Sequence, residues 1–269
     1  MDVGFLQFCP VFDDPQSNLK LIKKMLHQVK PPDILVLPEL TLTGYIFKNY
    51  KEAYSYSEEV GGLLTENLIN VANQYNTTMA VGFLERQGKN IYNSSVLLSG
   101  EGIIGVYRKV HLFYKEKEIF KAGDKGFPLF NVDGVKVGLL VCFDWIYPEA
   151  MRTLALKGAD LILHSANLVL PFYQDAARTR AIENRVFIVL ANRTGVEERE
   201  GMRFEFTGGS EVVNPMGEVI LKVGREEEGI FSVSINPEES RDKKVTEFND
   251  IFQDRREDLY EGWYNRESR

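Results

Sequence analysis

Three residues of this sequence, Glu39, Lys109 and Cys142, have the side chains that nucleophilic catalysis by a thiol requires. A thiol reacts once a nearby base accepts its proton, and a positive charge beside it favours the thiolate. Each of the three lies at or near the end of an apolar run, where α/β proteins usually place functional groups. If the fold brings them together, the carboxylate can accept the proton and the ammonium can supply the positive charge.

Each residue taken alone also has an ordinary structural explanation. Cys142 could be inert core packing, Lys109 could lie on an exposed edge strand, and Glu39 could cap the chain after a buried strand. A Cys–His pair with His111 or His164 is another way to activate the thiol, although both rings also suit structural hydrogen bonds. The residue pattern by itself leaves these alternatives open.

Three ordered sequence blocks around these residues resemble the catalytic blocks of the nitrilase, or carbon–nitrogen hydrolase, superfamily. The blocks are Pro38-Glu39-Leu40 with Thr43-Gly44-Tyr45, then Tyr107-Arg108-Lys109-Val110-His111-Leu112-Phe113, then residues 138–144 (GLLVCFD) with Pro148-Glu149. The resemblance extends over nearly the whole chain, and within the superfamily the sequence looks like the small thermophile-type nitrilases and amidases.

The resemblance implies a role for each of four residues. Glu39 is the general base, Lys109 is the cation that stabilises the tetrahedral intermediate, and Cys142 is the nucleophile. Glu116 resembles a second glutamate that orients Lys109 or the substrate, and a solvated charge run over 115–118 is the alternative. We expect no metal and no organic cofactor.

The implied reaction converts a small nitrile or amide to the carboxylic acid and ammonia through a covalent thioimidate or thioester. A nitrile is the preferred substrate on this resemblance. An aliphatic amidase, an ω-amidase or an N-carbamoyl amino acid amidohydrolase is the alternative. A non-catalytic binding or scaffold protein on the same fold is the alternative of another class.

A further set of residues lies close to the blocks and is predicted to contact the substrate. Asn167 follows an apolar strand at the level where Glu39 follows its own strand, and the others adjoin the catalytic blocks in sequence. The set is Phe143, Asp144, Trp145, Asn167, Tyr45 and His111.

The elements that must position these residues follow an α/β pattern. Strands are expected near 3–8, 34–37, 79–84, 91–98, 103–113 and 135–141, and helices from Asp14-Pro15 towards Pro31, over 65–75 and after Pro148. The three strands from 79 to 113 follow one another without helices, so part of the sheet must be antiparallel.

The second half of the sequence repeats the first. Val3-Gly4-Phe5-Leu6 matches residues 137–140, and residues 33–36 match residues 160–163, with a helix between the strands in both halves. We therefore predict two similar halves of one domain, residues 1–269. The resemblance implies a four-layer α-β-β-α sandwich with mixed sheets.

Composition excludes several classes of partner. The 269 residues carry 32 Lys+Arg and 39 Asp+Glu, a net charge of −7, with no basic stripe, so nucleic acid is not expected as a partner. The apolar runs are too short to span a bilayer, and the first residues carry no cationic region ahead of an apolar stretch. We expect no membrane partner and a cytoplasmic location.

The last part of the chain, about residues 236–269, is rich in charged and aromatic residues and is predicted to be a C-terminal extension. Leu259, Tyr260, Trp263 and Tyr264 are too apolar for a purely solvated arm. We predict that this extension packs on a partner subunit, and we expect a homodimer or a larger homo-oligomer.

Overall fold

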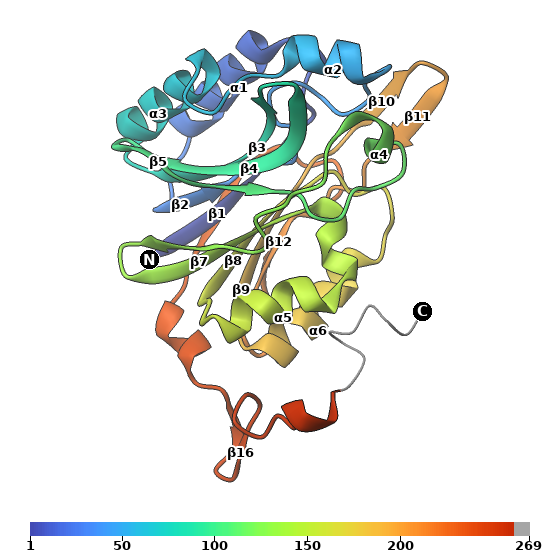
Figure 1. Cartoon of the computed structure of the whole chain (residues 1–269). Coiled ribbons are helices and arrows are strands. Elements are labelled where there is room, and N and C mark those ends of the chain that lie inside the picture. The colour runs from blue at the N-terminus through green and yellow to red at the C-terminus, as the bar shows by residue number, and fades with distance from the viewer. Residues whose placement is uncertain (261–269) are drawn as a thin grey trace.

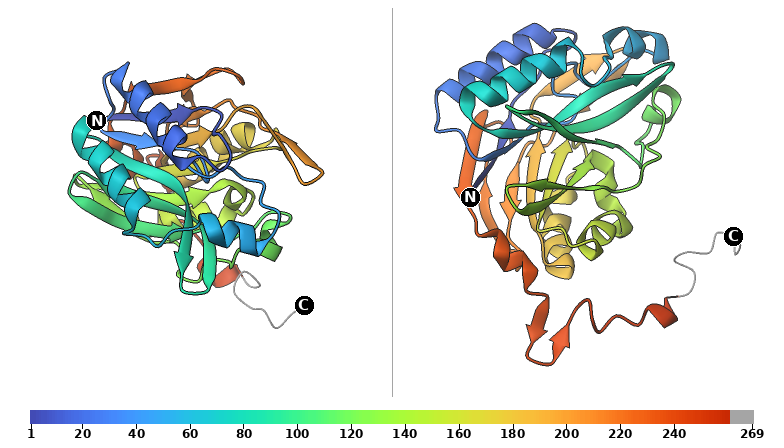
Figure 2. Two further views of the ribbon diagram at one scale, coloured as in Figure 1. Left: turned by 90° about the horizontal axis from the view of Figure 1, so that it is seen from above. Right: turned by 60° about the vertical axis from the view of Figure 1, so that its left-hand side comes forward.

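Two mixed six-stranded sheets lie face to face between two layers of helices (Figure 1). The computed structural model describes residues 1–260. In the right-hand view of Figure 2, the helices of the first half lie on one outer side, and α5 and α6 lie on the opposite side. The predicted α-β-β-α sandwich with mixed sheets is therefore confirmed.

The first sheet has the order β14-β1-β2-β3-β4-β5. β1 to β3 run parallel, and β14, β4 and β5 are antiparallel to their neighbours. The strands are β1 (Asp2–Gln7), β2 (Ile34–Val36), β3 (Thr78–Gln87), β4 (Asn90–Ser99), β5 (Gly102–Arg108) and β14 (Gly229–Ser234).

The second sheet has the order β13-β12-β9-β8-β7-β6. Its strands are β6 (Leu129–Val132), β7 (Val135–Val141), β8 (Leu161–Ala166), β9 (Phe187–Asn192), β12 (Glu211–Val213) and β13 (Val219–Lys222). β7 to β9 are parallel and the outer strands are antiparallel, so the two sheets share one pairing pattern. The repeat predicted from the sequence is thus present as two similar strand-helix-strand halves.

Six α-helices are present among the described residues, and the first begins at a clear local sequence signal. They are α1 (Pro15–His27), α2 (Tyr50–Tyr56), α3 (Leu63–Tyr75), α4 (Glu116–Ile119), α5 (Pro148–Leu156) and α6 (Tyr173–Asn184). Asp14 caps α1 by accepting a hydrogen bond from the Ser17 N–H, and Pro15 occupies the first turn. Leu19, Ile22 and Leu26 of α1 are buried on one face.

Strand alternation divides the apolar residues between two cores. Ile34 and Val36 of β2 belong to the core between the sheets, whereas Leu35 and Leu37 pack with the apolar faces of α1 and α3. This alternation follows from the two-residue period of a strand. Because β2 is buried on both faces, the chain that leaves it at Pro38 starts inside the molecule.

The structure differs from the sequence-based elements in the end of β5 and in several elements that were not predicted, among them α4, α6, β6 and β9. β5 ends at Arg108, so residues 109–113 form a loop and do not continue the expected strand. The short helix α2 was not predicted. Nor was the β10–β11 hairpin (Val196–Arg199 and Met202–Glu205), which projects beside α4 in Figure 1.

The C-terminal extension leaves the sandwich after β14. It contains the 3-10 turn Pro237–Arg241, the β15–β16 hairpin (Lys244–Thr246 and Asn249–Asp250) and the 3-10 turn Glu257–Leu259 (Figure 1). Leu259 is exposed and Tyr260 is partly exposed, while Trp263 and Tyr264 lie outside the described residues. Packing of this extension on a partner subunit remains a prediction.

A substitution of Gly82 in β3 tests how closely this strand packs against residues 38–40. A Cβ at Gly82 would overlap the backbone of Pro38 and Glu39, which cannot move aside as a flexible side chain can. We expect Gly82→Ala to lower the free energy of unfolding in urea by about 1–3 kcal/mol, the usual cost of overpacking. In the control Gly224→Ala, the new methyl meets only the end of the Glu227 side chain, and the change should stay within about 0.5 kcal/mol. Equal stability of the two variants would contradict the close packing of β3 against residues 38–40.

Candidate active site

Glu39 lies three residues beyond the end of β2, in a turn buried between the sheets. Its side chain is fully buried, and its N–H donates to the Ala166 carbonyl at the end of β8 (3.4 Å). The next residue, Leu40, adopts a positive φ of 49°, which turns the chain away from the sheet. The carboxylate is therefore presented at the junction of the two halves.

Lys109 follows directly after β5 and reaches the same point. Its ammonium Nζ lies 2.7 Å from Glu39 Oε1 and 2.9 Å from Glu116 Oε1, and it is fully buried. Glu116 is the first residue of α4, and its Oε2 accepts the Phe113 N–H (2.9 Å). The loop between β5 and α4 thus brings one buried cation against two buried carboxylates.

Asn93 of β4 is a member of this cluster that the sequence analysis did not identify. Its Nδ2 donates to Glu39 Oε1 (2.6 Å) and, more weakly, to Glu116 Oε1 (3.4 Å). It is fully buried in a strand whose neighbours are mostly apolar or small. An asparagine at such a position is the signal that could have found it, because a buried amide needs partners.

Glu197 of the β10–β11 hairpin was also not predicted from the sequence. It accepts hydrogen bonds from the N–H groups of Tyr45 (3.0 Å) and Ile46 (2.5 Å), and it pairs with Arg193 (2.6 Å) in the interior. The Tyr45 hydroxyl in turn donates to Glu116 Oε1 (2.8 Å). The hairpin therefore holds the loop that follows Glu39.

Cys142 occupies the sharp turn between β7 and α5. It is the first residue of the 3-10 turn Cys142–Ile146, it is buried, and its φ is +42°, a conformation that non-glycine residues rarely adopt. His164 Nε2 donates to the Cys142 carbonyl (3.0 Å), and the Tyr173 hydroxyl donates to His164 Nδ1 (2.7 Å). His164 therefore supports the backbone of the turn, and its contacts are structural.

Asn167 joins the turn at Cys142 to Glu39. Its Nδ2 donates to the Glu39 carbonyl (2.9 Å), and its backbone N–H interacts with the Cys142 thiol. The charges of Glu39, Lys109 and Glu116 all shift the pKa of this thiol. The structure thus brings together all four residues that were predicted to be catalytic.

Burial and charge set the protonation of this cluster. Burial lowers the pKa of Lys109, but the carboxylates of Glu116 and Glu39 outweigh it and hold that pKa above its ordinary value. Burial raises the pKa of the Cys142 thiol well above its ordinary value, and the Glu39 charge adds to this while Lys109 opposes it. Burial also raises the pKa of Glu116. Lys109 is therefore a permanent cation, and Cys142 rests as a neutral thiol.

Asp144 fixes the turn at Cys142 to the loop that carries Lys109. Its Oδ2 accepts from the Tyr107 hydroxyl (2.8 Å) and the Val141 N–H (3.0 Å), and its Oδ1 accepts from the His111 N–H (3.1 Å) and contacts His111 Nδ1 (2.8 Å). Both oxygens are thus engaged within the protein. The His111 ring also stacks on Tyr147 at 3.7 Å.

A narrow cavity of about 10 Å³ opens on the Cys142 thiol. Three of the six predicted substrate-binding residues line it, and Tyr45, Asp144 and His111 are not among its lining residues. The lining is Phe113, Cys142, Phe143, Trp145, Asn167, Leu168, Val169 and Leu170. Apart from Cys142 and Asn167, every side chain in this lining is apolar.

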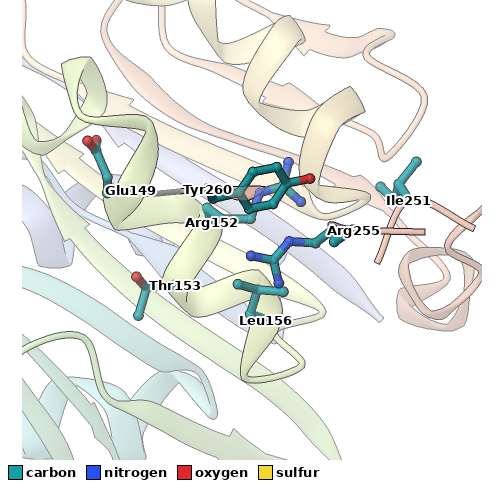
Figure 3. A pocket seen from close by; sticks show the side chains of 7 residues that line it. All are labelled: Glu149, Arg152, Thr153, Leu156, Ile251, Arg255 and Tyr260. Atoms are coloured by element: carbon teal, nitrogen blue, oxygen red, sulfur yellow. The ribbon is translucent and has the colours of Figure 1, made fainter. Parts of the chain in front are cut away.

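A larger hollow of about 460 Å³ lies elsewhere, between α5 and the C-terminal extension (Figure 3). It is lined by Glu149, Arg152, Thr153, Leu156, Ile251, Arg255 and Tyr260. None of the predicted catalytic residues lies in it.

Within residues 1–260, no group of three or more His, Cys, Asp or Glu side chains is arranged to hold a metal ion. No helix in that range has the length and apolar character needed to cross a bilayer.

Comparison with known proteins gives relatives along nearly the whole chain. The model of the carbon-nitrogen hydrolase family matches residues 2–244. A protein of Pyrococcus abyssi named nitrilase is 40% identical over 261 residues, which cover 96% of this chain and 98% of that protein. A 2-oxoglutaramate amidase of Bacillus subtilis is 33% identical and covers 96% of this chain and 98% of its own length.

The crystal structure of an amidase from Nesterenkonia sp. has the same fold, with a TM-score of 0.81 and 27% identity over 96% of this chain and 94% of that chain. A solved structure of a variant of that amidase shows the result of Michael addition of acrylamide at its active-site cysteine.

The buried His164 predicts a specific pH dependence of stability. Burial lowers the pKa of His164 from about 6.5 to about 4, so the unfolded chain binds a proton that the folded protein excludes as the pH falls through this range. This destabilisation by protonation of His164 in the unfolded chain is absent above about pH 6.5. Between pH 7 and pH 4 it should lower the free energy of unfolding by about 3 kcal/mol.

We expect the free energy of unfolding of His164→Gln, measured by urea titration at several pH values, to fall less than that of the wild type as the pH is lowered. A substitution of the exposed His27 is the control for removal of a histidine. An identical pH profile for His164→Gln and the wild type would show that His164 is not held neutral in the fold.

Proposed function

This chain belongs to the carbon-nitrogen hydrolase family, and we propose that it converts a small nitrile or amide to the carboxylic acid and ammonia, with Cys142 as nucleophile. Glu39 is the proposed base and Lys109 the cation that stabilises the developing negative charge. Glu116 orients Lys109. The observation that carries this proposal is the buried Glu39–Lys109–Glu116 cluster beside a cysteine in a sharp turn between β7 and α5.

The attack step follows from the protonation of the cluster. Because the pKa of the Cys142 thiol is raised, the thiol keeps its proton until the substrate arrives. Glu39 then accepts that proton while Sγ bonds to the carbonyl or nitrile carbon. The Lys109 ammonium and the Phe143 N–H, at the start of the 3-10 turn, stabilise the charge that forms on the oxygen or nitrogen.

The second half of the reaction reuses the same groups. For an amide, Glu39 returns the proton to the nitrogen, the C–N bond breaks, and ammonia leaves a thioester on Cys142. For a nitrile, addition of the thiol gives a thioimidate, which water converts to the thioester with release of ammonia. Glu39 then removes a proton from water, the water attacks the thioester, and the C–S bond breaks to return the thiol.

The two substrate classes have different support. The 40% identical relative is named nitrilase, and the narrow cavity suits a slim, linear group, which supports the nitrile preferred from the sequence. The Bacillus subtilis and Nesterenkonia relatives are amidases, which supports an amide. Because the same three groups serve both reactions, the choice between nitrile and amide and the identity of the acyl group remain predictions. The expected homodimer or larger homo-oligomer also remains a prediction.

The role of Glu39 as a base predicts opposite effects of one substitution on two reactions. Glu39→Gln should lower hydrolysis by at least about 10³-fold, because the members of such a unit act together. Because the Glu39 charge raises the pKa of the thiol, its loss should lower that pKa and move the pH midpoint of Cys142 alkylation by iodoacetamide downward.

Mass spectrometry of the Cys142 peptide separates this reaction from that of Cys9. Glu118→Gln, the same change at an exposed position of α4, is the matched control and should leave both readouts as in the wild type. An alkylation midpoint that is unchanged or raised in Glu39→Gln would be inconsistent with the proposed electrostatics.

A substrate panel tests the proposed reaction. Purified enzyme should release ammonia from short aliphatic nitriles or from the amides of the same acids, and Cys142→Ala should lower the rate to the background, because no other buried thiol faces the cluster within residues 1–260. The ratio of nitrile to amide turnover, measured as ammonia release, decides between the two classes. Absence of ammonia from every member of both series would refute the proposal.

A further inference from the structure

We propose that Asn167 binds the nitrogen of the substrate: its side-chain oxygen accepts a hydrogen bond from the substrate N–H, which favours binding of unsubstituted amides. This inference rests on the proposed function and adds a specificity-determining residue to it. It begins from an unusual observation, a buried side-chain oxygen beside the nucleophile that has no partner.

The orientation of the Asn167 amide is fixed by its neighbour. Its Nδ2 lies 2.9 Å from the Glu39 carbonyl oxygen, which can only accept a hydrogen bond. The nitrogen must therefore face Glu39, and the opposite flip would set two acceptors against each other. Oδ1 consequently points away from the Glu39 backbone.

Asn167 Oδ1 is buried and has no hydrogen-bond partner among the described residues. The side chain as a whole is only 3% exposed. Buried acceptors in folded proteins are almost always satisfied, and an exception calls for a ligand or another explanation. Glu39 Oε2 and Asn93 Oδ1 are also unpartnered in the cluster. The proposed reaction already uses Glu39 Oε2 as a proton acceptor, and Asn93 is not among the residues that line the cavity at Cys142.

The surroundings leave the substrate as the natural partner for Oδ1. Asn167 lines the cavity at Cys142, and its backbone N–H interacts with the thiol. Apart from the Cys142 thiol and the indole N–H of Trp145, the other side chains that line this cavity are hydrocarbon and offer no donor. A substrate carbon bonded to Sγ would carry its nitrogen or oxygen into reach of this amide.

The chemistry requires an acceptor for N–H at this point. When Sγ bonds to an amide carbon, the nitrogen becomes tetrahedral, with two N–H bonds and a lone pair. An acceptor that binds one N–H leaves the lone pair for the proton that Glu39 carries, so the C–N bond can break and ammonia can leave. A nitrile has no N–H until the thiol has added, and an ester has none at all.

Asn167 also has a structural contact, its hydrogen bond to the Glu39 backbone, and the two roles predict different outcomes. Loss of the structural contact would displace Glu39 and slow every substrate alike. Loss of Oδ1 as a substrate contact would harm an amide and spare an ester of the same acid. Substrates matched in the acyl group therefore separate the two roles.

The test compares propionamide with methyl propionate in the wild type, in Asn167→Ala and in Asn93→Ala. Asn93 also donates to Glu39 but is not among the residues that line the cavity, so its loss should lower both activities alike. We expect Asn167→Ala to lower kcat/KM for the amide about 10- to 100-fold more than for the ester, the usual effect of one lost hydrogen bond in a buried site.

A binding measurement makes the test independent of turnover. In the inactive Cys142→Ala background, calorimetry should show that Asn167→Ala weakens propionamide binding and leaves methyl propionate binding unchanged. Equal losses for amide and ester in both assays would overturn the role of Asn167 while leaving the proposed function intact. If the wild type hydrolyses no amide, nitrile or ester, the proposed function itself fails, and this inference fails with it.

Discussion

The arrangement of this molecule depends on one buried ammonium, that of Lys109, held between the carboxylates of Glu39 and Glu116. Removing such charges from water is costly unless they are paired and fully hydrogen-bonded. Here the pairing is supported by donors from separate elements, Asn93 on β4 and the hydroxyl of Tyr45. Burial, together with the net negative charge of this cluster, raises the pKa of the neighbouring thiol and keeps it protonated at rest. The cluster is thus both a folding constraint that joins distant segments and the feature that determines how Cys142 can react.

A second constraint acts on the backbone of Cys142 itself. A positive φ at Cys142 is unfavourable for a side chain with a Cβ, and it persists only if the surroundings impose it. His164 supports the Cys142 carbonyl, Asn167 connects the turn to Glu39, and Asp144 ties it to the loop after β5. The two halves of the sandwich therefore meet at the turn that carries Cys142.

The sequence predicted the features that local pattern determines. Apolar runs bounded by proline and glycine located β2 and β7, and the repeat between the halves indicated paired sheets. Residue type and position made Glu39, Lys109 and Cys142 candidates, and the resemblance to the nitrilase superfamily implied their roles. The sequence could not predict contacts set by three-dimensional packing: Asn93 reaches Glu39 across 54 residues, and Glu197 reaches Tyr45 across 152. The period-2 alternation of residues 107–113 also led us to extend β5 beyond Arg108. Alternation alone does not show that the chain leaves the sheet there, where Asp144 binds the His111 N–H of the following loop. For the same reason, sequence reasoning did not show that Asp144 and His111, both predicted to contact the substrate, also bind each other.

The central claim is that a covalent bond forms between Cys142 and the acyl carbon of the substrate. Acid quenching of the enzyme during turnover, followed by mass spectrometry of the Cys142 peptide, tests it most directly. The account predicts that this peptide gains the mass of the acyl group in the steady state and loses it as substrate is exhausted. Release of product with the Cys142 peptide unmodified at every time point, or undiminished turnover by Cys142→Ala, would contradict it.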